Sequence, residues 1–123
     1  MLLLTFALVV LSAAPQAAPQ QPAPELAVIS ARQGECFGDF VVTDAAGAPV
    51  YAAVVHVRVR YGFLGIKRID LEVGTNSEGR ARVEGLPAND RTLVYDITKD
   101  TLKTTVEQNL ETTCRAEHKV VLK

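Results

Sequence analysis

The chain has no tryptophan, only two histidines and only two cysteines in 123 residues. His56 and His118 are far apart in the sequence, and neither Cys36 nor Cys114 belongs to a Cys-x-x-Cys motif. This arrangement indicates neither a set of zinc ligands nor a redox-active cysteine pair. A glycine-rich phosphate loop and a Gly-x-Ser-x-Gly turn are also missing. We therefore expect no metal, no cofactor and no enzymatic activity.

An excess of positive charge is missing as well. The 13 Lys and Arg residues are balanced by 14 Asp and Glu residues, which gives a net charge of -1 at pH 7. Arg58 and Arg60 are expected to face acidic partners rather than to form a basic patch, so we expect no nucleic-acid partner. Carbohydrate binding has little support, because the tyrosines that could stack on sugars are scattered along a chain without tryptophan.

The first feature that is present is an apolar run, LLLTFALVVL at positions 2–11. It is too short to span a bilayer and ends in small residues at 12–14, which is typical of a secretory signal. Residues 15–24 are rich in proline, glutamine and alanine and carry no charge, so they predict a disordered spacer. We expect a signal peptide over 1–14, a spacer over 15–24 and one folded domain over 25–123. The protein is then secreted or periplasmic, with no membrane span in its mature form.

The two cysteines lie near opposite ends of the expected domain. A disulfide between Cys36 and Cys114 is favoured over two buried free thiols, because an exported protein rarely keeps thiols reduced. Such a bond would close most of the domain into one loop and would contribute roughly 4 kcal/mol in the chain-entropy model. We therefore predict a structural disulfide.

Two segments in the middle of the chain, 54–60 and 68–73, alternate apolar and polar residues as half-buried strands do. A hairpin whose turn is centred on Leu64 places inward residues opposite inward residues, whereas a slip of one residue would set them against charged ones. The predicted inward pairs are Val59 with Ile69, Val57 with Leu71 and Val55 with Val73. On the solvent face the same register predicts Arg58 opposite Asp70 and His56 opposite Glu72.

The remaining strands are predicted from strand-favouring composition between turn-forming residues. They lie at 40–43, 80–84, 92–98, 104–108 and 117–122, with turns at 44–49, 76–79, 87–90 and 99–101. Seven or eight short strands at this spacing, with no helical period after Pro24, predict an all-β sandwich.

Two phrases of the sequence suggest a family. VTDAAGAPV at 42–50 and TNSEGRARVEGLP at 75–87 resemble, in order and spacing, the carboxypeptidase regulatory-like domain. That domain is a transthyretin-like or prealbumin-like sandwich close to the Cna B-type repeats. The resemblance implies a seven-stranded Greek-key sandwich that acts as an accessory module beside enzymes, receptors and surface proteins. It also implies structural turns at Gly47 with Pro49, at Gly79, and at Gly85 with Pro87.

The expected hairpin turn contains more large apolar residues than a turn needs: Tyr61, Phe63, Leu64 and Ile66. Two arrangements remain open. Side chains that project into water would form a patch suited to a protein partner or a ligand. Alternatively, Phe63 and Leu64 fold back and cover the open end of the core. A small sandwich gains from covering its ends, which slightly favours the second arrangement.

We expect an exported, non-catalytic module that binds an unidentified extracytoplasmic protein or surface component. One alternative is a small hydrolase, because one branch of the transthyretin-like fold hydrolyses 5-hydroxyisourate. Its site would need His56 or His118 to meet an arginine across a subunit interface. The Tyr-Arg-Gly-Ser ending associated with that branch is replaced here by Val-Val-Leu-Lys. A carbohydrate-binding or purely structural module is a further alternative.

Overall fold

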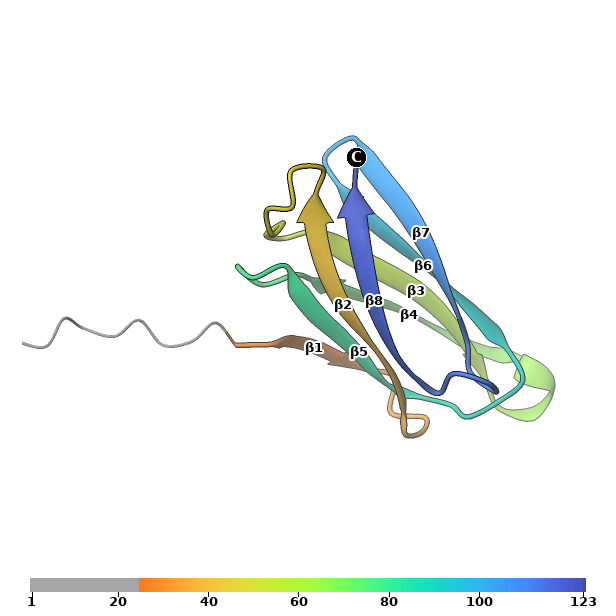
Figure 1. Cartoon of the computed structure of the whole chain (residues 1–123). Helices are drawn as coiled ribbons and strands as arrows, with labels where there is room; N and C mark the ends of the chain where they lie inside the picture. Colours follow the sequence, from red (N-terminus) through yellow and green to blue (C-terminus); the bar gives the residue numbers. More distant parts are fainter. Residues whose placement is uncertain (1–24) are drawn as a thin grey trace, which may run out of the picture.

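Two four-stranded sheets face each other in the computed structural model of the chain, which describes residues 25–123 (Figure 1). The strands are β1 Ala27–Ser30, β2 Cys36–Asp44, β3 Val54–Tyr61, β4 Lys67–Gly74, β5 Arg80–Leu86, β6 Thr92–Lys99, β7 Leu102–Asn109 and β8 Arg115–Leu122. The prediction of an all-β sandwich is confirmed. The expected signal peptide at 1–14 and spacer at 15–24 lie outside the described residues.

Each sheet brings together strands that are distant in the sequence. One sheet has the order β1-β5-β2-β8 and the other has the order β4-β3-β6-β7. In the first sheet β1 is parallel to β5 and β2 is parallel to β8. All pairs in the second sheet are antiparallel. The chain therefore crosses between the sheets after β2, β4, β5 and β7, so both sheets contain strands from both halves of the domain.

The β3–β4 hairpin has the predicted register at every position named above. Val55, Val57 and Val59 pair with Val73, Leu71 and Ile69, and the polar positions His56 and Arg58 pair with Glu72 and Asp70. The three valines are fully buried, because successive side chains of a strand point to opposite faces and theirs point between the sheets.

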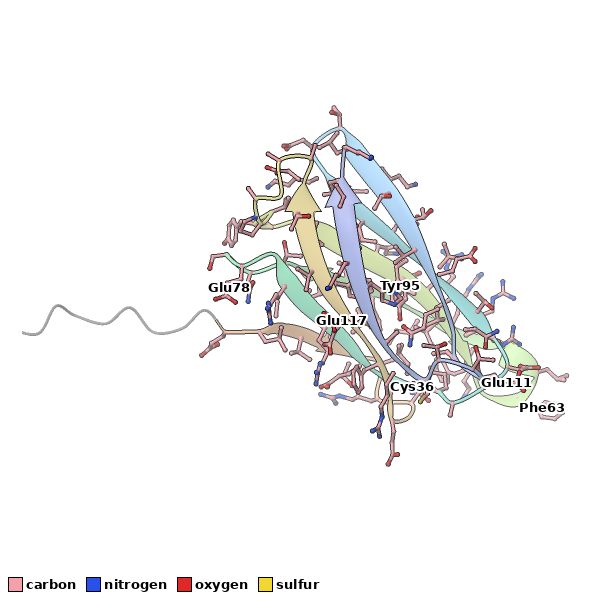
Figure 2. All side chains as sticks on the ribbon, viewed as in Figure 1. Cys36, Phe63, Glu78, Tyr95, Glu111 and Glu117 are labelled. Carbon is pink, nitrogen blue, oxygen red and sulfur yellow. A yellow bond between two sulfur atoms is a disulfide. The ribbon has the colours of Figure 1, made fainter. Side chains whose placement is uncertain are left out.

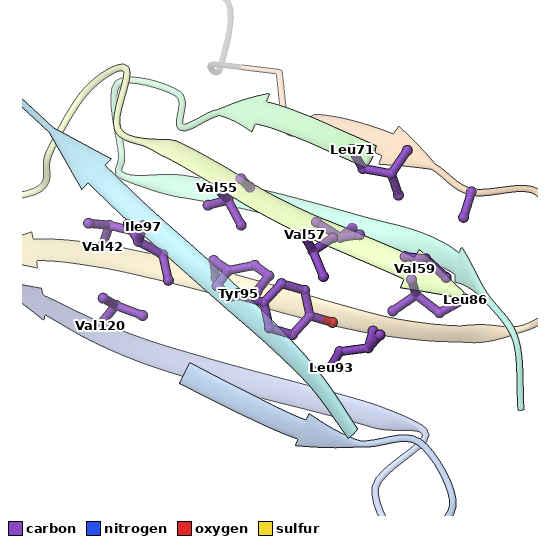
Figure 3. Packing of buried hydrophobic residues seen from close by; sticks show 14 of the residues in the cluster. Val42, Val55, Val57, Val59, Leu71, Leu86, Leu93, Tyr95, Ile97 and Val120 are labelled. Atoms are coloured by element: carbon purple, nitrogen blue, oxygen red, sulfur yellow. The ribbon is translucent and has the colours of Figure 1, made fainter. Parts of the chain in front are cut away.

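Inward-facing side chains of both sheets fill the core (Figure 3). The largest of them, Phe40 and Tyr95, are 1% and 0% exposed, and their ring centroids lie 4.7 Å apart in an edge-to-face arrangement. Aliphatic side chains surround this pair, and burying each of them contributes about 1.5–3 kcal/mol. They include Val42, Val55, Val57, Val59, Leu71, Leu86, Leu93, Ile97 and Val120.

The first sheet differs from the prediction in two ways. The strand β1 is not predicted, because its four residues lack a clean alternation and its partner β5 is far along the chain. The strand β2 begins at Cys36 rather than at Phe40, because its pairing with β8 continues along nearly its whole length. With β1 included the sandwich has eight strands, which agrees with the seven or eight predicted. Its only helical element within residues 25–123 is the 3-10 turn η1, Phe63–Gly65.

Two predicted turns contain glycines with positive φ, a conformation that side chains disfavour. The φ angle is 84° at Gly47 and 74° at Gly79. A Cβ on Gly47 would meet nothing within 4 Å, whereas a Cβ on Gly79 would collide with the carbonyl oxygen of Val42. The expected turn at Gly85 is wrong. Gly85 lies within β5, near a β-bulge where the register with β2 shifts. Bulges of this kind favour a glycine with positive φ, and the φ of Gly85 is 67°.

The predicted disulfide is present. Cys36 at the start of β2 bonds to Cys114, the residue just before β8, across a sequence separation of 78 residues. Phe37 also donates its backbone N–H to the Cys114 carbonyl oxygen at 2.9 Å. The covalent bond therefore ties the start of β2 to the start of β8, at the point where these two strands begin to pair.

Candidate functional site

The hairpin tip, residues 61–66 between β3 and β4, projects from one end of the sandwich (Figures 1 and 2). Phe63 is 83% exposed, and Leu64 and Ile66 are each 75% exposed. The arrangement in which Phe63 and Leu64 cover the core is therefore wrong. Val59, Leu86 and Leu93 already close this end of the core, since each is 3% exposed or less. The predicted residues Tyr61, Phe63, Leu64 and Ile66 do lie together on this tip.

Local backbone geometry explains why the apolar side chains point outward. Gly62, Leu64 and Gly65 all have positive φ, at 78°, 57° and 64°. Such a φ is unusual for leucine and costs conformational energy unless the surroundings enforce it. The Ile66 N–H bonds to the Phe63 carbonyl oxygen at 3.3 Å, and the Gly65 N–H bonds to the Gly62 carbonyl oxygen at 3.1 Å. The tip is therefore a defined turn that presents its large side chains to solvent.

Arg91, just before β6, anchors the tip from the side. Its Nη2 donates a hydrogen bond to the Leu64 carbonyl oxygen at 3.2 Å. The guanidinium also lies against Gly65, and a Cβ at that position would overlap it. This contact joins two segments that are far apart in the sequence, and nothing in the sequence pattern predicts it.

The solvent face of the hairpin becomes basic towards the tip. Arg58 and Asp70 form an ion pair, with Nε 3.0 Å from Oδ1. The hydrogen bond from Arg58, together with its positive charge, lowers the pKa of Asp70 although desolvation opposes this. The expectation that the β3 arginines face acidic partners therefore holds for Arg58. It is wrong for Arg60, which pairs in register with Arg68.

A hollow of about 430 Å³ lies beside this face, where β3 and β6 separate. The two strands pair only from Val54 with Thr98 to Val57 with Tyr95, although both continue beyond this point. The hollow is lined by Arg58, Arg60, Arg91, Thr92, Leu93 and Val94. Arg58 is already paired with Asp70, but Arg60 and Arg91 add two further cations, which makes the hollow suited to an anionic group.

His56 lies on the same face but outside this hollow. Its Cα is opposite Glu72 as predicted, yet its ring lies nearer to Asp70 and Asp96, at 3.6 Å and 4.0 Å. These contacts suit a solvated cross-strand cluster, with Lys103 a further 3.9 Å from Asp96. Within residues 25–123, no group of three or more His, Cys, Asp or Glu side chains is placed to hold a metal ion.

His118 belongs to a buried polar network that the sequence pattern does not predict. Its Nε2 lies 3.2 Å from Gln108 Oε1, which also accepts a hydrogen bond from the Tyr95 hydroxyl at 2.8 Å. The other end of Gln108 donates to the carbonyl oxygens of Phe37 and Thr113, at 3.0 Å and 2.8 Å. The network thus holds the segment before Cys114 against β2, which is a structural role.

The two ionisable members of this network have shifted pKa values. Burial lowers the pKa of His118 and raises the pKa of Tyr95, because each group loses solvation of its charged form. The His118 ring also stacks on Phe40, with centroids 4.9 Å apart. Both side chains therefore favour their neutral forms. The visible cue in the sequence is Gln108, a polar residue at an inward position of β7.

None of the described residues forms a helix with the length and apolarity needed to cross a bilayer. No protein-family model and no curated protein matches the sequence.

Solved structures that share the fold include two dioxygenases. One is 3-chlorocatechol 1,2-dioxygenase from Rhodococcus opacus 1CP, with a TM-score of 0.55 and 15% identity over 88% of this chain and 69% of that chain. The other is catechol 1,2-dioxygenase from Pseudomonas arvilla C-1, with a TM-score of 0.50 and 17% identity over 77% of this chain and 43% of that chain. At these identities the similarity shows a common β-sandwich fold alone.

Proposed function

We propose that the protein is an exported, non-catalytic β-sandwich module, of the carboxypeptidase regulatory-like type, that docks through its hairpin tip onto an extracytoplasmic protein or cell-surface component. The observation that carries the proposal is the exposure of Phe63, Leu64 and Ile66 together on one turn. Contiguous exposed apolar side chains are costly in water and mark interaction sites.

The way the tip is held supports the same proposal. A turn with internal hydrogen bonds and a contact from Arg91 keeps its shape before binding, so less conformational entropy is lost on docking. The disulfide supports an oxidising compartment, since such bonds persist mainly outside the cytoplasm.

Placement of the tip also favours docking. Asn76 Nδ2 donates to the Glu25 carbonyl oxygen at 3.1 Å, so the described chain begins beside the β4–β5 turn. That turn and the hairpin tip lie at opposite ends of β4 (Figure 1). The described chain therefore begins at the end of β4 opposite to the hairpin tip.

Site-specific photo-crosslinking in cells that produce the full chain tests the proposal. A benzophenone amino acid replaces Phe63 in one variant and Tyr51 in the other, which is also exposed but lies before β3, at the opposite end of the hairpin. We expect a discrete adduct with an envelope component from position 63 and none from position 51. Equal adducts from both positions, or none from either, would reject the proposal.

A further inference from the structure

The β3–β4 hairpin is ordered by level from its tip downward. Phe63, Leu64 and Ile66 come first. Behind the turn, the first pair of opposed residues is Tyr61 with Lys67. The next pair is Arg60 with Arg68, which lies on the solvent face. Only below these does an acidic residue appear, where Asp70 is bound by Arg58. The hairpin thus passes from apolar, through amphipathic and cationic, to electrically balanced.

This order matches the layers of an anionic lipid surface. Strands rise about 3.4 Å per residue, so the Arg60–Arg68 level lies about 3.4 Å behind the Tyr61–Lys67 level, and the turn that contains Phe63 projects beyond both. Apolar groups of peripheral proteins enter about 5–10 Å into the boundary of headgroups and acyl chains. Tyrosine favours the interface, and lysine and arginine favour the phosphate level. The order of side chains along the hairpin therefore follows the order of the lipid layers that they prefer.

We propose that the partner of the hairpin tip is a bilayer rich in anionic lipid, an inference that rests on the proposed function. Phe63, Leu64 and Ile66 enter the acyl boundary, while Arg60, Lys67 and Arg68 contact lipid phosphates. The hollow lined by Arg58, Arg60 and Arg91 lies beside the same levels and accepts a further headgroup.

A lipid surface fits the tip better than a protein does. The exposed apolar side chains Phe63, Leu64 and Ile66 stand on a projecting turn, so docking on a protein would require a matching pocket. A bilayer accepts a convex tip of any outline. Both strands of the hairpin carry cations, and Asp70 is the only acidic residue between positions 58 and 70. This charge distribution is complementary to a negatively charged surface.

The absence of tryptophan provides a direct test with the full chain. The variant F63W places a single indole at the tip, and Y51W places one at the opposite end of the hairpin. Each is mixed with vesicles of phosphatidylcholine alone or of equal parts phosphatidylcholine and phosphatidylglycerol. We expect the F63W emission to shift to the blue with the anionic vesicles only, and the Y51W emission to stay unchanged.

Charge variants in the F63W background separate the electrostatic contribution to vesicle binding from the contribution of apolar insertion. Because each cation near an anionic leaflet contributes about fivefold in affinity, R60E/R68E should weaken binding at least about twentyfold. K119E/K123E changes the net charge equally at exposed positions of the last strand and beyond, and should change binding much less.

No blue shift of F63W, an equal shift with neutral vesicles, or an equal shift of Y51W would each overturn the lipid assignment. A protein adduct from position 63 in cells, without a vesicle response, would overturn it while leaving the docking function in place.

Discussion

Arg91 and Leu64 are joined by a hydrogen bond of 3.2 Å from a guanidinium nitrogen to a backbone carbonyl oxygen, which ties the start of β6 to the hairpin tip. The acceptor belongs to the residue of the tip with the least favourable backbone conformation, a leucine at φ 57°. The contact therefore explains how an exposed apolar turn keeps one shape.

Replacing Arg91 with alanine should loosen the tip without unfolding the sandwich. Loss of one partly exposed hydrogen bond costs about 0.5–1.5 kcal/mol. Hydrogen exchange at the Gly65 and Ile66 amides measures the local effect, and we expect it to accelerate while exchange in β3 stays unchanged. R91K is the matched variant and should preserve part of the protection. Unchanged exchange in R91A would show that the turn needs no anchor.

Two glycines provide a matched pair for the cost of a close backbone approach. Both G47A and G79A place a side chain at positive φ, which costs about 1–2 kcal/mol. Only at Gly79 would the new Cβ also collide with a backbone atom, the Val42 carbonyl oxygen. Chemical denaturation should therefore show a larger loss for G79A than for G47A. Equal losses would contradict the close packing of the 76–79 turn against β2.

Stability should fall as the pH drops below about 6.5 because of His118. Burial lowers the pKa of His118 in the folded state below its pKa in the unfolded chain. Between these two values the unfolded chain binds more protons than the folded protein. The free energy of unfolding then rises with pH in this window, by at most about 1.4 kcal/mol per pH unit, and levels off above it. The variant H118Q should lose this part of the pH dependence, and a persisting slope would assign it to another group.

Reduction should destabilise the domain strongly. The Cys36–Cys114 bond closes a loop of most of the sandwich, and its loss costs about 4 kcal/mol in the chain-entropy model. Melting with and without reductant measures this loss. The double variant C36A/C114A should melt near the reduced protein and show no response to reductant. Equal melting temperatures of the oxidised and reduced wild type would show that the disulfide does not stabilise the domain.

Local pattern predicts much of this structure because the period of a half-buried strand is visible within a few residues. The β3–β4 register follows from matching six inward positions, and Tyr95 follows from its alternation with Leu93 and Ile97. The strand β1 cannot be predicted in this way, because it forms by pairing with the edge of β5, which is distant in the sequence.

The candidate site is less predictable than the strands that support it. The residues of the tip are visible in the sequence, but their exposure depends on whether other side chains already close the core. Val59, Leu86 and Leu93 do so, and they come from three different strands. The Gln108 network likewise depends on contacts among β2, β7 and the segment before β8.

The most direct test of the docking tip compares F63S/L64S with the wild type on cells that produce the protein. The measurement is the fraction of each protein that remains bound to the cell surface, with the melting temperature recorded for both. Since both side chains are mostly in water, we expect surface retention to be lost while the melting temperature stays unchanged. Undiminished retention would contradict the account, and so would a marked fall in melting temperature, because it would make the tip part of the core.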